Sequence, residues 1–126
     1  MLRTGILAAA AAGAALALSG CAPIPKTVDT PKNGDTFALT VNQPMEVRWG
    51  NQRPDQGDWV LETPKGAALA AKGRMVQPPG EGAQQVEIFD FQAAQKGDEN
   101  LTFTYRHKDG QPATADEQVT ITVKVG

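Results

Sequence analysis

The chain has 126 residues, 21% of them charged, and a formal net charge of −2 at pH 7. This length suits one domain with a modest core, and no basic patch is dense enough to suggest a nucleic-acid partner. The only serine is Ser19, the only cysteine is Cys21 and the only histidine is His107. These counts argue against nucleophilic catalysis and against a zinc site, so we expect no enzyme activity, no metal and no cofactor. A mechanism that uses carboxylates alone stays open, but no paired motif suggests one.

Residues 1–20 have the layout of an export signal. One positive charge, Arg3, precedes an apolar run from Ile6 to Leu18. This run is shorter than the roughly 20 residues that a membrane-spanning helix needs, and its length is typical of a signal peptide. Leu18-Ser19-Gly20-Cys21 resembles the lipobox of bacterial lipoprotein precursors. An ordinary secretory signal followed by a chance cysteine is the alternative.

The lipobox resemblance implies cleavage before Cys21, with acylation of its thiol and of the new amino group. Two or three acyl chains hold a protein on a membrane far better than one. The next residue is Ala22, which by the same resemblance implies the outer membrane of a Gram-negative cell, facing the periplasm. Residues 21–34 contain three prolines, which favour extended backbone, so we expect a lipidated N-terminus followed by a tether.

From residue 35 onward apolar and polar side chains alternate with period two, which is typical of strands that bury one face. Turn residues separate the runs. Residues 67–76 fit a strand better than a short helix, because a glycine bounds the alanines closely at either end. In 85–92 the apolar phase changes, so either both faces are buried or a bulge lies at Ile88 and Phe89. The predicted strands cover residues 37–41, 45–49, 59–62, 67–76, 85–92, 101–106 and 119–125.

About seven to eight short strands, with a tryptophan on the third, predict an immunoglobulin-like antiparallel β-sandwich over residues 35–126. This class is all-β. The chain has no pair of cysteines to bridge the sheets, so apolar burial alone must hold them together. We expect Trp59 in this core, whereas Trp49 fits either the core or a partly exposed contact. His107 sits among charged residues at a turn, so we expect a solvated side chain, with a ligand or a pH switch as the alternative.

Three segments, taken in order, carry a family resemblance. The first is Gly50-Asn51-Gln52-Arg53-Pro54-Asp55-Gln56-Gly57-Asp58-Trp59, the second is Pro79-Gly80-Glu81-Gly82-Ala83, and the third follows Leu101-Thr102-Phe103-Thr104-Tyr105-Arg106. Over essentially all of residues 35–126 this layout resembles the chagasin-like inhibitors of papain-type cysteine peptidases. In that family three loops at one end of the sandwich form a wedge. They read Asn-Pro-Thr-Thr-Gly, Gly-X-Gly-Gly and Arg-Pro followed by an aromatic residue.

Five positions match those motifs: Asn51, Gly57, Gly80, Gly82 and Arg106. The two threonines of the first motif are absent, Ala83 stands in place of the last glycine, and His107 and Lys108 replace proline and the aromatic residue. The resemblance implies that the following residues form the peptidase-binding loops: Asn51, Gln52, Arg53, Pro54, Asp55, Gln56, Gly57, Gly80, Glu81, Gly82, Ala83, Arg106, His107 and Lys108. The alternatives are a plain turn in the first loop and a flexible link in the second.

Two functions fit this sequence. The first is a monomeric envelope lipoprotein that inhibits a papain-like cysteine peptidase through these loops. The second is a non-inhibitory module that binds another envelope protein on the same scaffold, because fold alone does not fix function.

Overall fold

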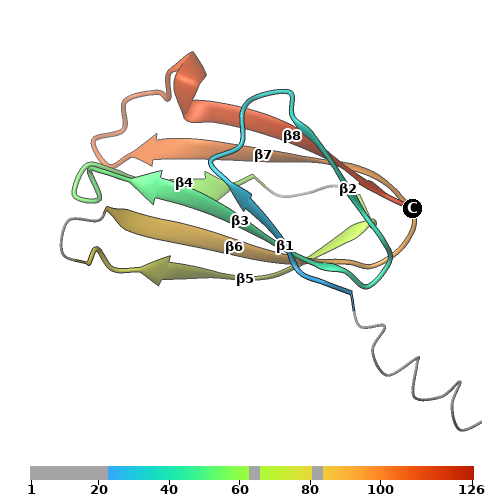
Figure 1. Cartoon of the computed structure of the whole chain (residues 1–126). Coiled ribbons are helices and arrows are strands. Elements are labelled where there is room, and N and C mark those ends of the chain that lie inside the picture. The colour runs from blue at the N-terminus through green and yellow to red at the C-terminus, as the bar shows by residue number, and fades with distance from the viewer. Residues whose placement is uncertain (1–22, 63–65, 81–83) are drawn as a thin grey trace, which may run out of the picture.

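The computed structural model describes residues 23–62, 66–80 and 84–126 (Figure 1). The expected signal peptide of residues 1–20, the lipidation site Cys21 and the loop residues Glu81, Gly82 and Ala83 lie outside the described residues. None of the described helices is long and apolar enough to cross a membrane. The described elements are β1 (Lys26–Asp29), β2 (Thr36–Leu39), β3 (Pro44–Asn51), β4 (Gly57–Leu61), β5 (Leu69–Gln77), β6 (Gln85–Ala93), β7 (Gly97–His107), the 3-10 helix η2 (Ala115–Glu117) and β8 (Gln118–Val125).

The strands form two four-stranded sheets, ordered β1-β3-β6-β5 and β2-β8-β7-β4, which pack face to face as a sandwich (Figure 1). This architecture confirms the predicted all-β, immunoglobulin-like fold. Most neighbouring strands are antiparallel, but β1 pairs in parallel with β3 and β2 pairs in parallel with β8. Parallel neighbours need a crossover between them, and β2 supplies it for β1 and β3 by lying in the opposite sheet.

The segment that was expected to be a tether contributes strand β1. Val28 on this strand is buried in the core, with 4% of its surface exposed, and Pro31 just after it is also buried. The backbone continues along the sheet, where the Thr30 N–H donates to the Arg48 carbonyl at 2.9 Å. The folded part of the chain therefore starts before residue 35, because a valine in this proline-rich stretch reaches the core.

The inner faces of both sheets carry the apolar residues that the period-two pattern predicted to be buried. Phe103 lies at the centre of an aromatic cluster, with ring centroids 5.4 Å from Trp49, 5.2 Å from Phe89 and 6.4 Å from Phe91. Such tilted and edge-on pairs add stability beyond the area that they bury. The other core residues include Met45, Val47, Leu101, Val119, Ile121, Val123 and Val125.

The two segments with an ambiguous pattern, 67–76 and 85–92, both form strands. Residues 69–77 form β5, as predicted for 67–76. In β6 both faces are buried near its centre, since Ile88 and Phe89 are 3% and 4% exposed. The register shift lies in the neighbouring strand β5, between Ala71 and Gly73, and not in β6. A bulge in an edge strand is a common way to keep that edge from pairing with another chain.

The structure decides between the two alternatives for Trp49 and places Trp59 at the margin of the core, where it was expected inside it. Trp49 is fully in the core at 2% exposed, because its strand β3 lies between β1 and β6. Trp59 is half-buried, because β4 is the outer strand of its sheet. The two rings stack with centroids 4.2 Å apart.

We predict that Phe103→Ala in the domain of residues 23–126 lowers the free energy of unfolding by about 3–5 kcal/mol, the usual loss for a buried aromatic residue. Urea unfolding followed by tryptophan fluorescence measures this loss. Lys124→Ala, at an exposed position on β8, is the control and should change the free energy by less than about 0.5 kcal/mol. Equal effects of the two substitutions would contradict this account of the core.

Candidate functional site

Three loops gather at one end of the sandwich, which we call the loop end (Figure 1). They are the first loop (residues 52–56, after β3), the described residues 78–80 and 84 of the second loop (after β5) and the third loop (108–117, after β7). The chain enters the domain at the opposite end, where the Gln43 side chain donates to the Ile24 carbonyl at 2.8 Å. The sheet topology therefore places the three expected loops together and away from the N-terminal segment.

The loops surround a cleft of about 310 Å³. Trp49, Trp59 and Tyr105 contribute aromatic rings to its lining, with the Trp59 and Tyr105 centroids 5.6 Å apart in an edge-on arrangement. The lining also draws on Gln52 and Arg53 of the first loop, Gln84 of the second and Glu117 of the third. Concave sites with apolar walls and a few polar groups are typical places for recognition.

Asn51 is buried beneath the first loop, where it holds the loop backbone, and it does not lie on the loop surface. It is 2% exposed, and its side-chain amide donates to the Gly57 carbonyl at 2.9 Å and to the Glu87 carboxylate at 2.8 Å. Its oxygen accepts from the Arg53 N–H at 3.1 Å. One buried side chain thus ties the start of the loop to its end, which is the local turn chemistry typical of asparagine.

Gly57 is fixed by close packing. A Cβ at this position would lie 2.4 Å from the Arg106 carbonyl oxygen and 2.7 Å from a ring carbon of Tyr105. The Tyr105 hydroxyl in turn donates to the Arg53 carbonyl at 2.8 Å, and burial raises the pKa of this hydroxyl above its ordinary value of 10.0. The two ends of the first loop are therefore held by buried groups.

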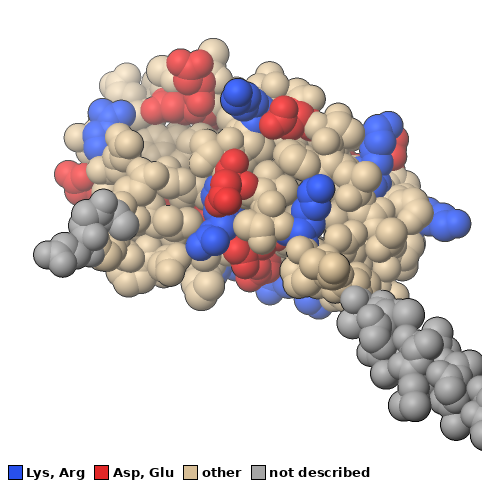
Figure 2. All heavy atoms as spheres, viewed as in Figure 1, with Lys and Arg blue, Asp and Glu red and all other residues tan. Residues whose placement is uncertain are grey.

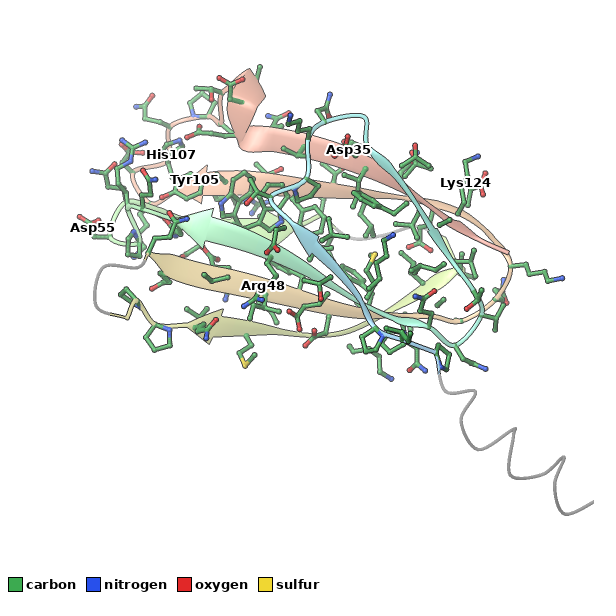
Figure 3. All side chains as sticks on the ribbon, viewed as in Figure 1. Asp35, Arg48, Asp55, Tyr105, His107 and Lys124 are labelled. Carbon is green, nitrogen blue, oxygen red and sulfur yellow. The ribbon has the colours of Figure 1, made fainter. Side chains whose placement is uncertain are left out.

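The side chains that a partner would meet are those at the tip of the first loop. Gln52, Arg53, Asp55 and Gln56 are exposed, and Pro54 is half-buried. The Gln56 N–H donates to the Arg53 carbonyl at 2.9 Å, which closes the turn. Figure 3 shows Asp55 at the extreme of the loop end.

The third loop packs against the first. The Lys108 N–H donates to the Gln56 carbonyl at 2.9 Å, and the Lys108 ammonium donates to the Pro54 carbonyl at 3.2 Å. Arg106 does not join them, because its guanidinium pairs with Glu62 at 3.2 Å. Of the matched positions in the second loop, Gly80 is exposed with open space around it.

His107 is not the solvated side chain that its charged neighbours suggested. Its ring is 21% exposed, lies edge-on to Tyr105, and its Nε2 is 2.7 Å from the Glu117 carboxylate (Figure 3). The Thr114 N–H and the His107 ring hydrogen-bond to Glu117 and lower the pKa of that carboxyl. This pair fastens the third loop to the end of β7.

Charges elsewhere are mixed. Figure 2 shows acidic and basic side chains interspersed over the visible face, with no large patch of one sign. Among the described residues no group of three or more His, Cys, Asp or Glu side chains is placed to hold a metal ion.

Glu87 also belongs to the site, although the sequence patterns did not predict it. It is fully buried beneath the loop end and accepts hydrogen bonds from Asn51, Trp59 and Arg74. The sequence did contain a signal for its burial. Glu87 is two residues before Phe89 and four before Phe91, so all three lie on the same inward face of the strand.

No protein-family model and no curated protein matches the sequence. Among solved structures, the cysteine protease inhibitor EhICP2 from Entamoeba histolytica is similar with a TM-score of 0.67 and 8% identity, over 81% of this chain and 95% of that one. The solution structure of amebosin is similar with a TM-score of 0.61 and 19% identity, over 82% and 99%.

The chain has the fold of the chagasin-like inhibitors. At these identities the likeness establishes the fold alone, and the matched inhibitor spans nearly the same length as the sandwich.

We predict that Gly57→Ala destabilises the domain by about 1–3 kcal/mol, because the added methyl group meets backbone that cannot move freely. Gly80→Ala is the matched control and should stay within about 0.5 kcal/mol, since its Cβ meets open space. Urea unfolding measures both. A Gly57→Ala protein as stable as Gly80→Ala would show that the first loop is not packed as described.

We predict that His107→Ala, which removes the ring donor, raises the pKa of Glu117 toward its ordinary value of 4.5 but not fully to it, because the Thr114 N–H still donates. A carboxyl with a lowered folded-state pKa contributes stability that is present above its unfolded pKa and lost as pH falls through the folded one. The variant should therefore lose less stability than the parent on acidification below 4.5. A ¹³C NMR titration of the Glu117 carboxyl measures the shift, and an unchanged pKa would contradict the pairing.

Proposed function

We propose that this chain is a bacterial envelope lipoprotein that inhibits papain-like cysteine peptidases, acting as a monomer through the three loops of the loop end. In this proposal the precursor is cut before Cys21 and lipidated there, and the domain faces the periplasm from the outer membrane. The observation that carries the proposal is the assembly of the three loops at one end of a sandwich with the inhibitor fold.

The orientation of the domain suits a lipid anchor. Four residues, 22–25, separate Cys21 from the start of β1, so a lipid at Cys21 would hold the domain close to the membrane. The loop end lies opposite the point where the N-terminal segment enters. An anchored protein would thus present its loops to the aqueous compartment, where a soluble peptidase can reach them.

The loops are also arranged to bind with little loss of entropy. Asn51, the Tyr105 hydroxyl and the Lys108 N–H hold the backbone of the first loop from three sides. Binding then orders few further groups, and a pre-ordered surface keeps more of its interaction free energy as affinity. The contacts would come from the exposed side chains of the first loop and from the backbone beside them.

A specific observation favours the second candidate, a non-inhibitory envelope module. Three of the four described matched positions offer no polar side chain to a partner, because Asn51 is buried and Gly57 and Gly80 have no side chain. The fourth, Arg106, is exposed but already bonds Glu62 through one of its terminal nitrogens. The matched positions thus support the framework, and the partner would be chosen by residues that differ from the inhibitor motifs.

The test is a titration of the soluble domain, residues 22–126, against papain and a cathepsin-like peptidase, reading residual activity. We expect stoichiometric inhibition, weakened by about tenfold or more in Asp55→Lys, because the substitution reverses a charge at the loop tip that a partner would cover. Asp98→Lys makes the same change at an exposed site on β7, near the end opposite the loops, and should inhibit like the parent.

Two results would contradict this proposal. A folded domain that inhibits neither enzyme at micromolar concentration would favour the non-inhibitory module. Inhibition that is lost equally in Asp55→Lys and Asp98→Lys would place the contact surface elsewhere.

A further inference from the structure

The loop end contains a buried carboxylate with three donors. Glu87 has no exposed surface. One of its oxygens accepts from the Asn51 amide at 2.8 Å, the Trp59 N–H approaches both oxygens at 3.2 and 3.3 Å, and the other oxygen also bonds the Arg74 guanidinium. Both oxygens are thus occupied as acceptors, as a buried carboxylate requires.

The three donors come from three segments that border the loops. Asn51 ends β3 and starts the first loop, Trp59 follows that loop in β4, and Arg74 lies on β5, which leads into the second loop. Because β4 and β5 are the outer strands of different sheets, Glu87 joins the two sheets at their open edge. It accepts the Trp59 N–H on a strand that has no neighbour on that side.

Stability alone gives a poor reason for a glutamate at this position. Its inward-facing neighbours along β6 are Phe89 and Phe91, and well-packed apolar groups often stabilise a core as well as a buried ion pair does. A carboxylate differs from an apolar side chain in being directional, since each oxygen fixes where a donor must lie. Arg74 is also held in place from its other side, with its guanidinium 5.6 Å from the centre of the Phe89 ring.

We propose that Glu87 is the positioning residue of the candidate site. It fixes both ends of the first loop through Asn51 and Trp59, and it couples that loop to the edge strand β5 through Arg74. Its effect on peptidase inhibition rests on the proposed function, whereas its effect on loop order does not.

The substitution Glu87→Gln tests this role with little change of shape. A carboxylate only accepts hydrogen bonds, whereas an amide group must donate from one of its two ends. One of the three donors then faces an N–H group and loses its acceptor. The side chain of Arg74 is 37% exposed and can turn to solvent, so we expect Arg74 to be released first and the Asn51 contact to weaken with it.

Glu99→Gln is the matched control. Glu99 is also a buried carboxylate on an inner face, 4% exposed, and it accepts the Leu69 N–H at 2.9 Å. It lies near the start of β7, away from the loop end. Both variants convert a buried carboxylate into an amide, but only Glu87 has an ion-pair partner, and one Glu99 oxygen has no hydrogen-bond partner among the described residues. Any difference in general destabilisation is therefore removed by comparing each loop amide with a core amide of the same protein.

The experiment is hydrogen exchange by NMR on the domain of residues 23–126, which contains all of the described strands and the whole described core. The reporters are the amides of Arg53, which bonds Asn51, and of Trp59, which bonds Glu87. In Glu87→Gln we expect both to exchange about tenfold faster or more relative to the amide of Ile121 in the core, which reports global opening. In Glu99→Gln the exchange rates of the Arg53 and Trp59 amides, relative to that of Ile121, should match those of the parent.

Arg74→Met provides a second variant in case Glu87→Gln does not fold. It removes the cation at a partly exposed position and leaves the other two donors, so the same amides should exchange about threefold faster. Loop amides that stay as protected as in the parent in every folded variant would overturn the inference. Equal acceleration in Glu99→Gln would overturn it too, because the effect would then be global.

The peptidase assay separates the two proposals. If the parent inhibits, Glu87→Gln should dissociate about tenfold faster while Glu99→Gln dissociates at the parent rate, since disordered loops must be ordered again on binding. If the parent does not inhibit, the proposed function fails, and the exchange ratios alone decide whether Glu87 positions the loops.

Discussion

The structure depends on one constraint: two sheets without a covalent bridge must be held together by what lies between them. The aromatic rings around Phe103 pack together with the aliphatic core residues between the sheets, and they join β3 and β6 of one sheet to β7 of the other. Rings that meet at an angle resist sliding of one sheet over the other as well as separation. This fixed spacing allows the strand ends, and so the loops, to hold defined positions.

Toward the loop end the interior changes from apolar to polar. Beyond Trp49 and Phe89 the inward positions are Asn51 and Glu87, and Tyr105 presents its hydroxyl there. Loop backbone has no ladder partner, so buried side chains must satisfy its polar groups. The polar interior at this end therefore serves the loops, and its cost is offset by the apolar cluster beside it.

Buried residues that hold the loop backbone and exposed residues that a partner would contact are different residues. This separation explains how the fold is kept while the sequence diverges. The sandwich matches an inhibitor at only 8% identity. The fold requires that the inward-facing strand positions are apolar and that the turns are compact, and many sequences meet these two requirements. Asn51 and Gly57 belong to this framework, since one bonds loop backbone and the other leaves room for it. The exposed residues between them are free to change with the partner.

The sequence by itself determined the strands, their inward faces and the sandwich class, because a strand's period-two burial is local and visible in a run such as Val119 to Val125. It did not place β1 in the sheet, bury Trp49 more deeply than Trp59, or join His107 to Glu117. It also did not bring Asn51, Arg74 and Glu87 to one point. Only the tertiary structure decided these features, because each depends on which strands lie side by side and in what register, and such pairing is not local.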